Sequence, residues 1–207
     1  MLKSETVKAL NAATGTQIGH LAHDAAAWFQ AFYLQTDRLF CHGDCENDCF
    51  KIPWNKGDRF QPVVERHFWV TTLYHTLESI EALNVALIAH GDNRLQTLKT
   101  AILDADRFQE MRRKLRNETE HYIEYFIGEG RKQNEFETII TTPMGEMRTD
   151  SHWLVQVEDK CFIGDVDCLE TIKHMMKYRD ELVPCLEKIM IDYWEKENNG
   201  QDAHGNP

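Results

Sequence analysis

Apolar residues recur every three or four positions along much of the chain, which is the spacing of amphipathic helices. This pattern predicts a first helix over residues 17–40 and a second over residues 62–89. Pro62 suits the first turn of the second helix, and the HGDN sequence at 90–93 ends it. A third helical stretch is predicted over residues 94–127, and two closely spaced glycines follow its end.

The periodicity then changes to the alternation that is typical of strands. β-branched residues dominate positions 136–142, a turn sequence follows, and residues 153–157 and 161–163 alternate again. We expect these residues to form a small antiparallel β-sheet of two or three strands.

Helical spacing returns over residues 165–194, and Pro184 is expected to kink or divide this helix because proline cannot donate a backbone hydrogen bond. The polar residues 198–207 are typical of a disordered tail. The pattern predicts a mainly α protein, an up-and-down helical bundle with a small antiparallel β insertion at residues 136–163 before the last helix. We expect a single domain over residues 1–197.

Composition favours a globular protein of the cytoplasm. Hydrophobic residues make up 42% and charged residues 28% of the 207 positions. No apolar run reaches the roughly 18 residues that a membrane span needs, and no apolar export signal is present at the start of the sequence. The six cysteines are therefore expected to be reduced thiols.

The chain is acidic, but one segment of it is not. Acidic residues outnumber basic ones by 34 to 23, for a net charge of −11. Such a charge repels nucleic-acid phosphates and argues against an extended nucleic-acid platform. Residues 107–132 contain seven basic and five acidic side chains, so this segment carries +2. A small basic cleft for a compact anion is therefore compatible with the sequence.

The positive segment contains the most informative residues, the sequence RNETEH at 116–121. Arg116 supplies a permanent cation, Asn117 an amide, and His121 a group that titrates near neutral pH. On a helix, Arg116 and His121 lie about 140° apart, so one helix presents the two side chains poorly to a common ligand. A twofold dimer with this helix at its interface would place two arginines and two histidines around one cleft.

The same residues also have an ordinary structural interpretation. Arg116 and Glu120 are four residues apart and can form a solvated ion pair, worth a few tenths of a kcal/mol. His121 would then be a partly buried residue of the core or its rim.

The segment MRRKLRNETEHYIEYF at 111–126 resembles the signature helix of the HEPN superfamily (higher eukaryotes and prokaryotes nucleotide-binding). The mark of that helix is an arginine, four to six intervening residues of which the first is polar, and then a histidine. The resemblance implies a HEPN-like helical bundle that forms a homodimer. It also implies a metal-independent endoribonuclease without a cofactor, of the kind found in toxin–antitoxin and phage-defence systems.

The resemblance implies a role for each residue of the motif. His121 would act as general acid or base on the RNA 2′-OH and the leaving oxygen, and Arg116 would stabilise charge on the phosphorus in the transition state. Asn117 would orient the phosphate or the histidine, and Glu120 would hold the imidazole tautomer. The neighbouring cations expected to bind RNA are Arg112, Arg113 and Lys114.

Two alternatives stay open. HEPN-like proteins also include non-catalytic modules that bind nucleotides, RNA or protein partners, and an antitoxin could be such a partner. A metal-binding protein is the second alternative, because the loop at residues 41–60 spaces three thiols four residues apart with a histidine between them. The candidate ligands in that loop are Cys41, His42, Cys45 and Cys49.

Other side chains have a structural explanation that we prefer. His67 and His75, with Glu78, lie near one face of the second helix, where satisfied core or rim histidines are usual. His20 and His23, with Asp24, resemble a metal-binding pair, but no Glu-x-x-His set converges with them. The first helix is also expected to place four aromatic residues in the hydrophobic core: Trp28, Phe29, Phe32 and Tyr33.

Overall fold

The fold is mainly α, with small antiparallel sheets before the last helices, as the sequence predicts. The computed structural model describes residues 4–40, 61–103, 138–142, 145–149, 154–157, 160–163 and 166–202. The helices are α1 (Ser4–Asn11), α2 (Gly15–Phe40), α3 (Gln61–Ala89), α4 (Gln96–Leu103), α7 (Cys168–Lys177) and α8 (Arg179–Asp202). The strands are β1 (Thr138–Thr142), β2 (Gly145–Thr149), β3 (Leu154–Val157), β4 (Lys160–Ile163) and β5 (Val166–Asp167).

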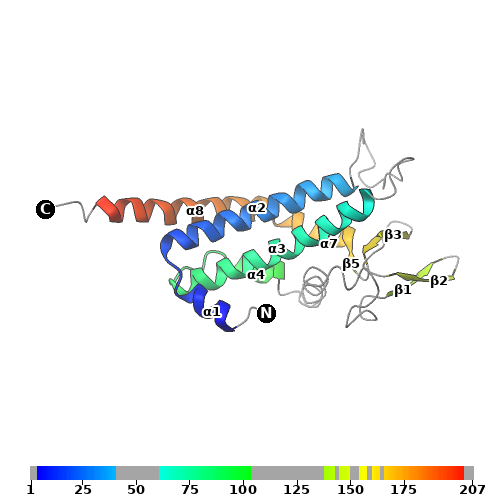
Figure 1. The fold of residues 1–207 in the computed structure, drawn as a ribbon, viewed down its shortest axis with the longest axis horizontal. Helices are drawn as coiled ribbons and strands as arrows, with labels where there is room; N and C mark the ends of the chain where they lie inside the picture. The colour runs from blue at the N-terminus through cyan, green and yellow to red at the C-terminus, as the bar shows by residue number, and fades with distance from the viewer. Residues whose placement is uncertain are drawn as a thin grey trace.

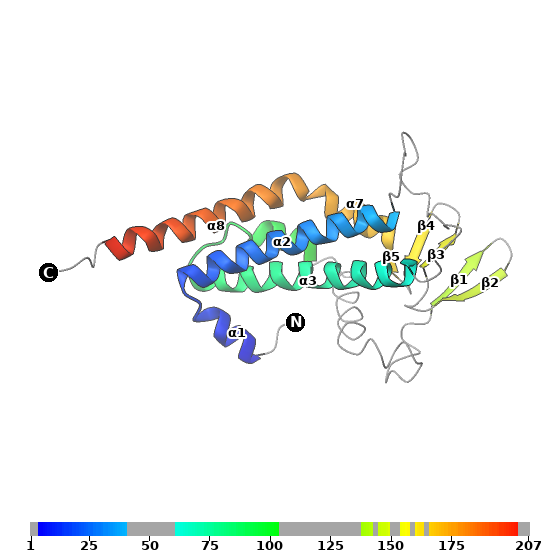
Figure 2. The same ribbon diagram turned by 45° about the horizontal axis from the view of Figure 1, so that its top comes forward.

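The long helix α2 is the centre of the bundle. It runs antiparallel to α3 and packs against it, and α8 packs against α2 as well (Figure 1). The shorter helices α1 and α4 both contact α3. The strands lie at one end of the bundle, whereas α8 runs toward the opposite end (Figure 2). Helix α2 therefore buries two faces, one against α3 and another against α8.

The contact between α2 and α3 is centred on an aromatic cluster. Trp69 of α3 is fully buried, and its indole N–H donates a hydrogen bond to the Thr36 hydroxyl of α2 over 3.0 Å. Its ring centroid lies 5.5 Å from that of Phe32 and 6.1 Å from that of Phe40. The polar atom of the tryptophan is thus satisfied inside an apolar cluster, as burial requires.

Two reciprocal hydrogen bonds fix the start of α2. The Thr14 N–H donates to Gln17 Oε1 (2.8 Å), and the Gln17 N–H donates to Thr14 Oγ1 (3.4 Å). This is a capping box, in which a threonine and a glutamine three residues later satisfy the free N–H groups of a helix start. The helix consequently begins at Gly15, two residues before the predicted start.

The HGDN sequence ends α3, as predicted. Gly91 has a φ of +73°, the left-handed conformation that glycine adopts without a steric penalty. The Asp92 N–H donates to the Leu87 carbonyl over 2.9 Å, the long-range hydrogen bond of a Schellman motif. His90 Nε2 donates to the Ala13 carbonyl (2.7 Å), which joins this turn to the start of α2.

An ion-pair network joins the same turn to α8. The Arg94 guanidinium contacts the Asp92 carboxylate over 2.7 Å and also pairs with Asp192 of α8. The Tyr193 hydroxyl donates to Asp92 over 3.4 Å. The hydrogen bond from Arg94 lowers the pKa of Asp92, and the same bond raises the pKa of Arg94. Residues far apart in the sequence therefore fix α8 against the α3–α4 connection.

The predicted β insertion is present as two sheets of short antiparallel strands. β1 pairs with β2, with Thr138 opposite Thr149 and Thr142 opposite Gly145. β4 lies between β3 and β5 in a three-stranded sheet. The sequence predicted one sheet of two or three strands, and the described residues divide into two because β2 pairs back onto β1 at once.

The last helical run divides at Tyr178 and not at Pro184, where the sequence predicted a kink or a division. Tyr178 follows the last residue of α7 and has φ −100° and ψ 2°. Pro184 lies inside α8, near its start, where a missing N–H removes only one hydrogen bond of the helix. The helix continues to Asp202, into the predicted tail, and residues 203–207 lie outside the described residues.

A close approach between α2 and α8 predicts a specific requirement for Gly19. A Cβ atom at this position would lie 2.4 Å from Nε1 of Trp194, whereas one at Gly15 would meet Tyr193 Cδ1 at 3.8 Å, an ordinary contact. Gly19→Ala is therefore expected to displace the indole and to be less stable than Gly15→Ala by about 1–3 kcal/mol in urea unfolding. Equal stability of the two variants would contradict this contact.

Candidate functional site

The predicted catalytic motif lies outside the described residues. This applies to Arg116, Asn117, Glu120 and His121, and to the expected RNA-binding cations at positions 112–114. In the chain, the motif follows α4 and precedes β1. The geometry of the motif therefore stays a prediction, while the helices before and after it are those of the predicted bundle.

The predicted metal loop, with Cys41, His42, Cys45 and Cys49, also lies outside the described residues. Within the ranges that the structure describes, no group of three or more histidine, cysteine, aspartate or glutamate side chains could hold a metal ion. The described cysteines Cys161, Cys168 and Cys185 are free thiols.

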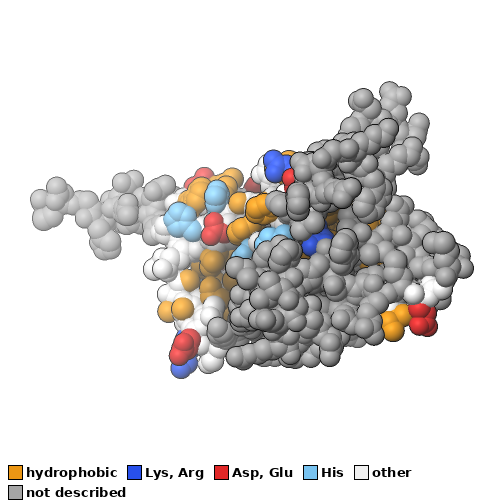
Figure 3. Space-filling model, turned by 45° about the vertical axis from the view of Figure 1, so that its right-hand side comes forward, with side chains coloured by type: hydrophobic (Ala, Val, Ile, Leu, Met, Phe, Trp, Pro, Cys, Tyr) orange, Lys and Arg blue, Asp and Glu red, His pale blue; other side chains and the backbone are white. Residues whose placement is uncertain are grey.

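The histidines of α2 flank a tryptophan. The ring centroids of His20 and His23 lie 6.0 Å and 6.5 Å from that of Trp194 on α8. His23 Nδ1 also lies 3.5 Å from Asp24. On the face of the molecule shown in Figure 3, histidine side chains lie among apolar ones in more than one place. The pair at His20 and His23 thus contacts Trp194 of α8, while both side chains stay exposed.

The histidines of α3 are half-buried, as the structural interpretation predicted. The His75 ring stacks on Trp28 of α2, with centroids 4.5 Å apart and planes at 25°. Burial lowers the pKa of His75, and the nearby Glu78 opposes this shift. Burial also lowers the pKa of His67, and the positive charge of Arg66 adds to the effect. The surroundings of both imidazoles therefore favour the neutral form.

These two shifts predict that the protein loses stability in mild acid. Both folded-state pKa values lie below the ordinary value of 6.5, so the unfolded chain takes up protons first as the pH falls below 6.5. The free energy of unfolding is expected to be lower at pH 5.5 than at pH 7.5 in urea titrations. The difference should shrink in the double variant His67→Gln/His75→Gln, and an unchanged difference would contradict the assignment.

A second acid transition is expected from Asp92. Its folded-state pKa lies below 3.8. The ionised Asp92 therefore stabilises the folded protein above pH 3.8, and this stabilisation is lost as the pH falls through the folded-state pKa. The contribution of the histidines to stability is therefore lost at a higher pH than that of the ion-pair network.

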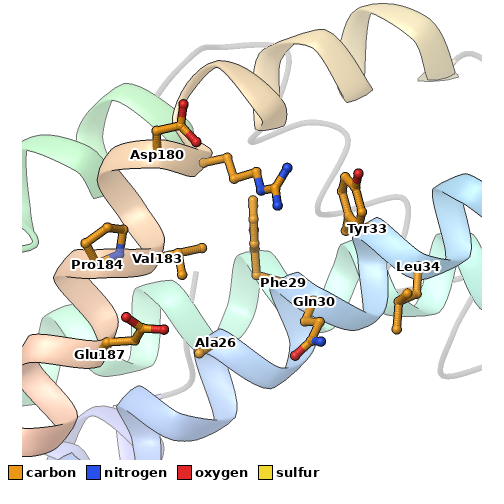
Figure 4. A pocket seen from close by; sticks show the side chains of 10 residues that line it. Ala26, Phe29, Gln30, Tyr33, Leu34, Asp180, Val183, Pro184 and Glu187 are labelled. Carbon is orange, nitrogen blue, oxygen red and sulfur yellow. The ribbon is translucent and has the colours of Figure 1, made fainter.

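A pocket of about 560 Å³ opens between α2 and α8 (Figure 4). Its apolar floor includes the Phe29 ring, which is 3% exposed. This volume lies within the range of small-ligand sites, which are mainly apolar and contain a few polar groups. The lining residues from α2 are Ala26, Phe29, Gln30, Tyr33 and Leu34. Those from α8 are Arg179, Asp180, Val183, Pro184 and Glu187.

The charged groups of the pocket come from α8. The Arg179 guanidinium lies over the Tyr33 ring, with its central carbon 4.7 Å from the ring centroid. Among the described residues, no ion pair involves Arg179, Asp180 or Glu187. The pocket therefore offers one cation and two carboxylates that a ligand could bind.

Sequence reasoning did not predict this pocket because it placed Tyr33 in the core. Tyr33 is 38% exposed, whereas Phe29 and Phe32 are buried. The aromatic residues 28–33 span more than one helical turn, so they cannot all point to one side. That spacing could have predicted that one of these aromatic residues is exposed. No periodicity predicts that Arg179 lies opposite Tyr33.

No family model, no curated protein and no solved structure matches the chain. Among the described helices, none is long and apolar enough to cross a membrane.

Proposed function

We propose that the protein is a metal-independent endoribonuclease of HEPN type that acts as a homodimer. The observation that carries this proposal is the sequence RNETEH at 116–121, in a segment of opposite charge to the rest of the chain. The helices α3 and α8, which both run antiparallel to α2, support it, because with α2 they form the kind of bundle that the resemblance implies. In this proposal the enzyme works in the cytoplasm, as a toxin with an antitoxin or as a phage-defence effector.

The proposed reaction uses the RNA 2′-OH as the nucleophile. His121 of one protomer removes the 2′-OH proton, and the 2′-oxygen attacks the adjacent phosphorus. The bond from phosphorus to the 5′-oxygen breaks, and a protonated His121 of the other protomer returns a proton to that oxygen. The products are a 2′,3′-cyclic phosphate and a 5′-OH end. Arg116 stabilises the charge that develops on the phosphoryl oxygens.

The remaining polar residues position the reacting groups. Asn117 orients the phosphate or the imidazole, and Glu120 holds the tautomer of His121. Arg112, Arg113 and Lys114 bind the phosphates of neighbouring nucleotides. Because the basic potential is confined to this segment, we expect a compact substrate such as an exposed RNA loop.

The direct test is RNA cleavage by the purified protein in EDTA. We expect cleavage to continue in EDTA, to leave 2′,3′-cyclic phosphate ends, and to stop when a single 2′-deoxy nucleotide replaces the one at the cleavage site. DNA of the same sequence should stay intact, because it lacks the 2′-OH. Loss of cleavage in EDTA, or cleavage of the 2′-deoxy substrate, would contradict the mechanism.

The net charge of −11 favours a second candidate, a non-catalytic HEPN-like module. Its acidic surface would contact a basic protein partner, and the motif would hold a nucleotide or stabilise the dimer. This candidate predicts intact RNA in the same assay together with nucleotide binding that Arg116→Ala abolishes.

A further inference from the structure

We propose that the pocket between α2 and α8 binds a short apolar peptide with free ends. The site is separate from the motif at 116–121, and it does not depend on the ribonuclease proposal. The pocket has an apolar middle and charged groups toward both ends. A peptide with apolar side chains and two charged termini has its groups in the same order.

The antiparallel packing of the two helices gives the pocket its direction. Figure 4 shows Tyr33 of α2 near the start of α8, and Ala26 on the side of Glu187. Phe29 and Val183 lie between these ends. The Arg179 guanidinium is thus at one end, with Asp180 next to it in the chain, and the Glu187 carboxylate is at the other, with apolar side chains between them.

The spacing of Arg179 and Glu187 along α8 matches about three extended residues. Arg179 and Glu187 are eight positions apart on α8, a rise of about 12 Å at 1.5 Å per residue. A chain of three extended residues spans up to roughly 10–11 Å. A tripeptide can therefore place its carboxylate near Arg179 and its ammonium group near Glu187.

The charges of the pocket favour a ligand with both charges over a simple anion. Asp180 and Glu187 together outnumber the single cation Arg179, so the pocket is acidic in sum and would repel an anion without a compensating ammonium group. The Arg179 guanidinium lies over the Tyr33 ring and has no ion pair among the described residues, and its N–H groups can bind a carboxylate in a bidentate manner. The free C-terminus of a peptide can bind Arg179, and its free N-terminus can bind Glu187.

The middle of the peptide is expected to be apolar. Phe29 is buried as the floor, and Val183 and Pro184 form the wall on α8. Burial of an apolar side chain against them supplies affinity, while the charged ends set the direction in which the peptide binds.

The test is calorimetric titration of the full chain with the tripeptide Leu-Phe-Leu and two relatives of it, one acetylated at its N-terminus and one amidated at its C-terminus. We expect the free tripeptide to bind one per chain, and each blocked form to bind roughly five- to tenfold more weakly. Arg179→Gln should remove the penalty of amidation alone, and Glu187→Gln the penalty of acetylation alone.

Lys188→Gln is the matched control, because Lys188 is exposed on α8 and does not line the pocket. This variant should keep both penalties. Arg179 and Glu187 are also exposed, so their variants should fold, which circular dichroism can verify. No saturable binding to the wild type, equal binding of the three peptides, or the same loss in Lys188→Gln would overturn the proposal.

Discussion

The variant His121→Ala is expected to cut RNA about 10²- to 10⁴-fold more slowly than the wild type, the usual contribution of general acid–base catalysis. The loss should fall on kcat more than on KM, because the imidazole transfers protons in the chemical step and does not bind the phosphate. Single-turnover cleavage of a short labelled RNA measures the chemical step directly. The bell-shaped pH profile of the wild type should lose its histidine limbs in this variant.

Arg116→Ala should produce a loss of about 10²- to 10³-fold, because its charge is needed where negative charge develops. His23→Ala and Arg38→Ala are matched controls, since both residues are exposed on α2. Mixing the two inactive motif variants offers a further test. A mixed dimer keeps one intact Arg116 and one intact His121, so a composite site predicts that part of the activity returns. Full activity of either motif variant would end the ribonuclease proposal.

The second large effect is expected in the core, where Trp69→Ala should lower the free energy of unfolding by about 3–5 kcal/mol. The residue is fully buried between Phe32 and Phe40, so truncation leaves a cavity that neighbouring rings fill only partly. It also removes the donor that satisfies the Thr36 hydroxyl. Typical domains have only 5–15 kcal/mol in total, so the midpoint of urea unfolding should fall sharply.

Phe68→Ala is the control for this prediction, because the neighbouring Phe68 is 52% exposed and should cost well under half as much. A double-mutant cycle separates packing from the hydrogen bond. Trp69→Phe leaves the Thr36 hydroxyl unsatisfied, and adding Thr36→Val should recover part of the loss, since removing both partners is nearly neutral. Equal costs for Trp69→Ala and Phe68→Ala would contradict the described core.

The long helices could be predicted from the sequence because one face of each is buried. Ile18, Ala25 and Phe32 recur at helical spacing in α2, and all three are fully buried. Helix α1 was missed because it has no buried residue of its own and is placed by packing on α3. The division was predicted at Pro184 and not at Tyr178 because proline disfavours a helix interior, whereas the change of direction between α7 and α8 depends on tertiary packing.

The two candidate sites differ in how well they can be predicted from the sequence. The motif at 116–121 is local, so residue chemistry and spacing point to it without any knowledge of the fold. The pocket depends on residues such as Tyr33 and Arg179, which are far apart in the sequence. Their meeting results from the packing of α8 on α2, which no local pattern encodes.

The position of α2 between α3 and α8 has a consequence for the newly made chain. Residues 41–178 separate α2 from α8, and ribosomes add roughly 5–20 residues per second. The hairpin of α2 and α3 can therefore form on the order of ten seconds before α8 exists. Until then, the face of α2 around Gly19 and Phe29 lacks its partner α8. That interval is when the nascent protein is most exposed to aggregation and to capture by chaperones.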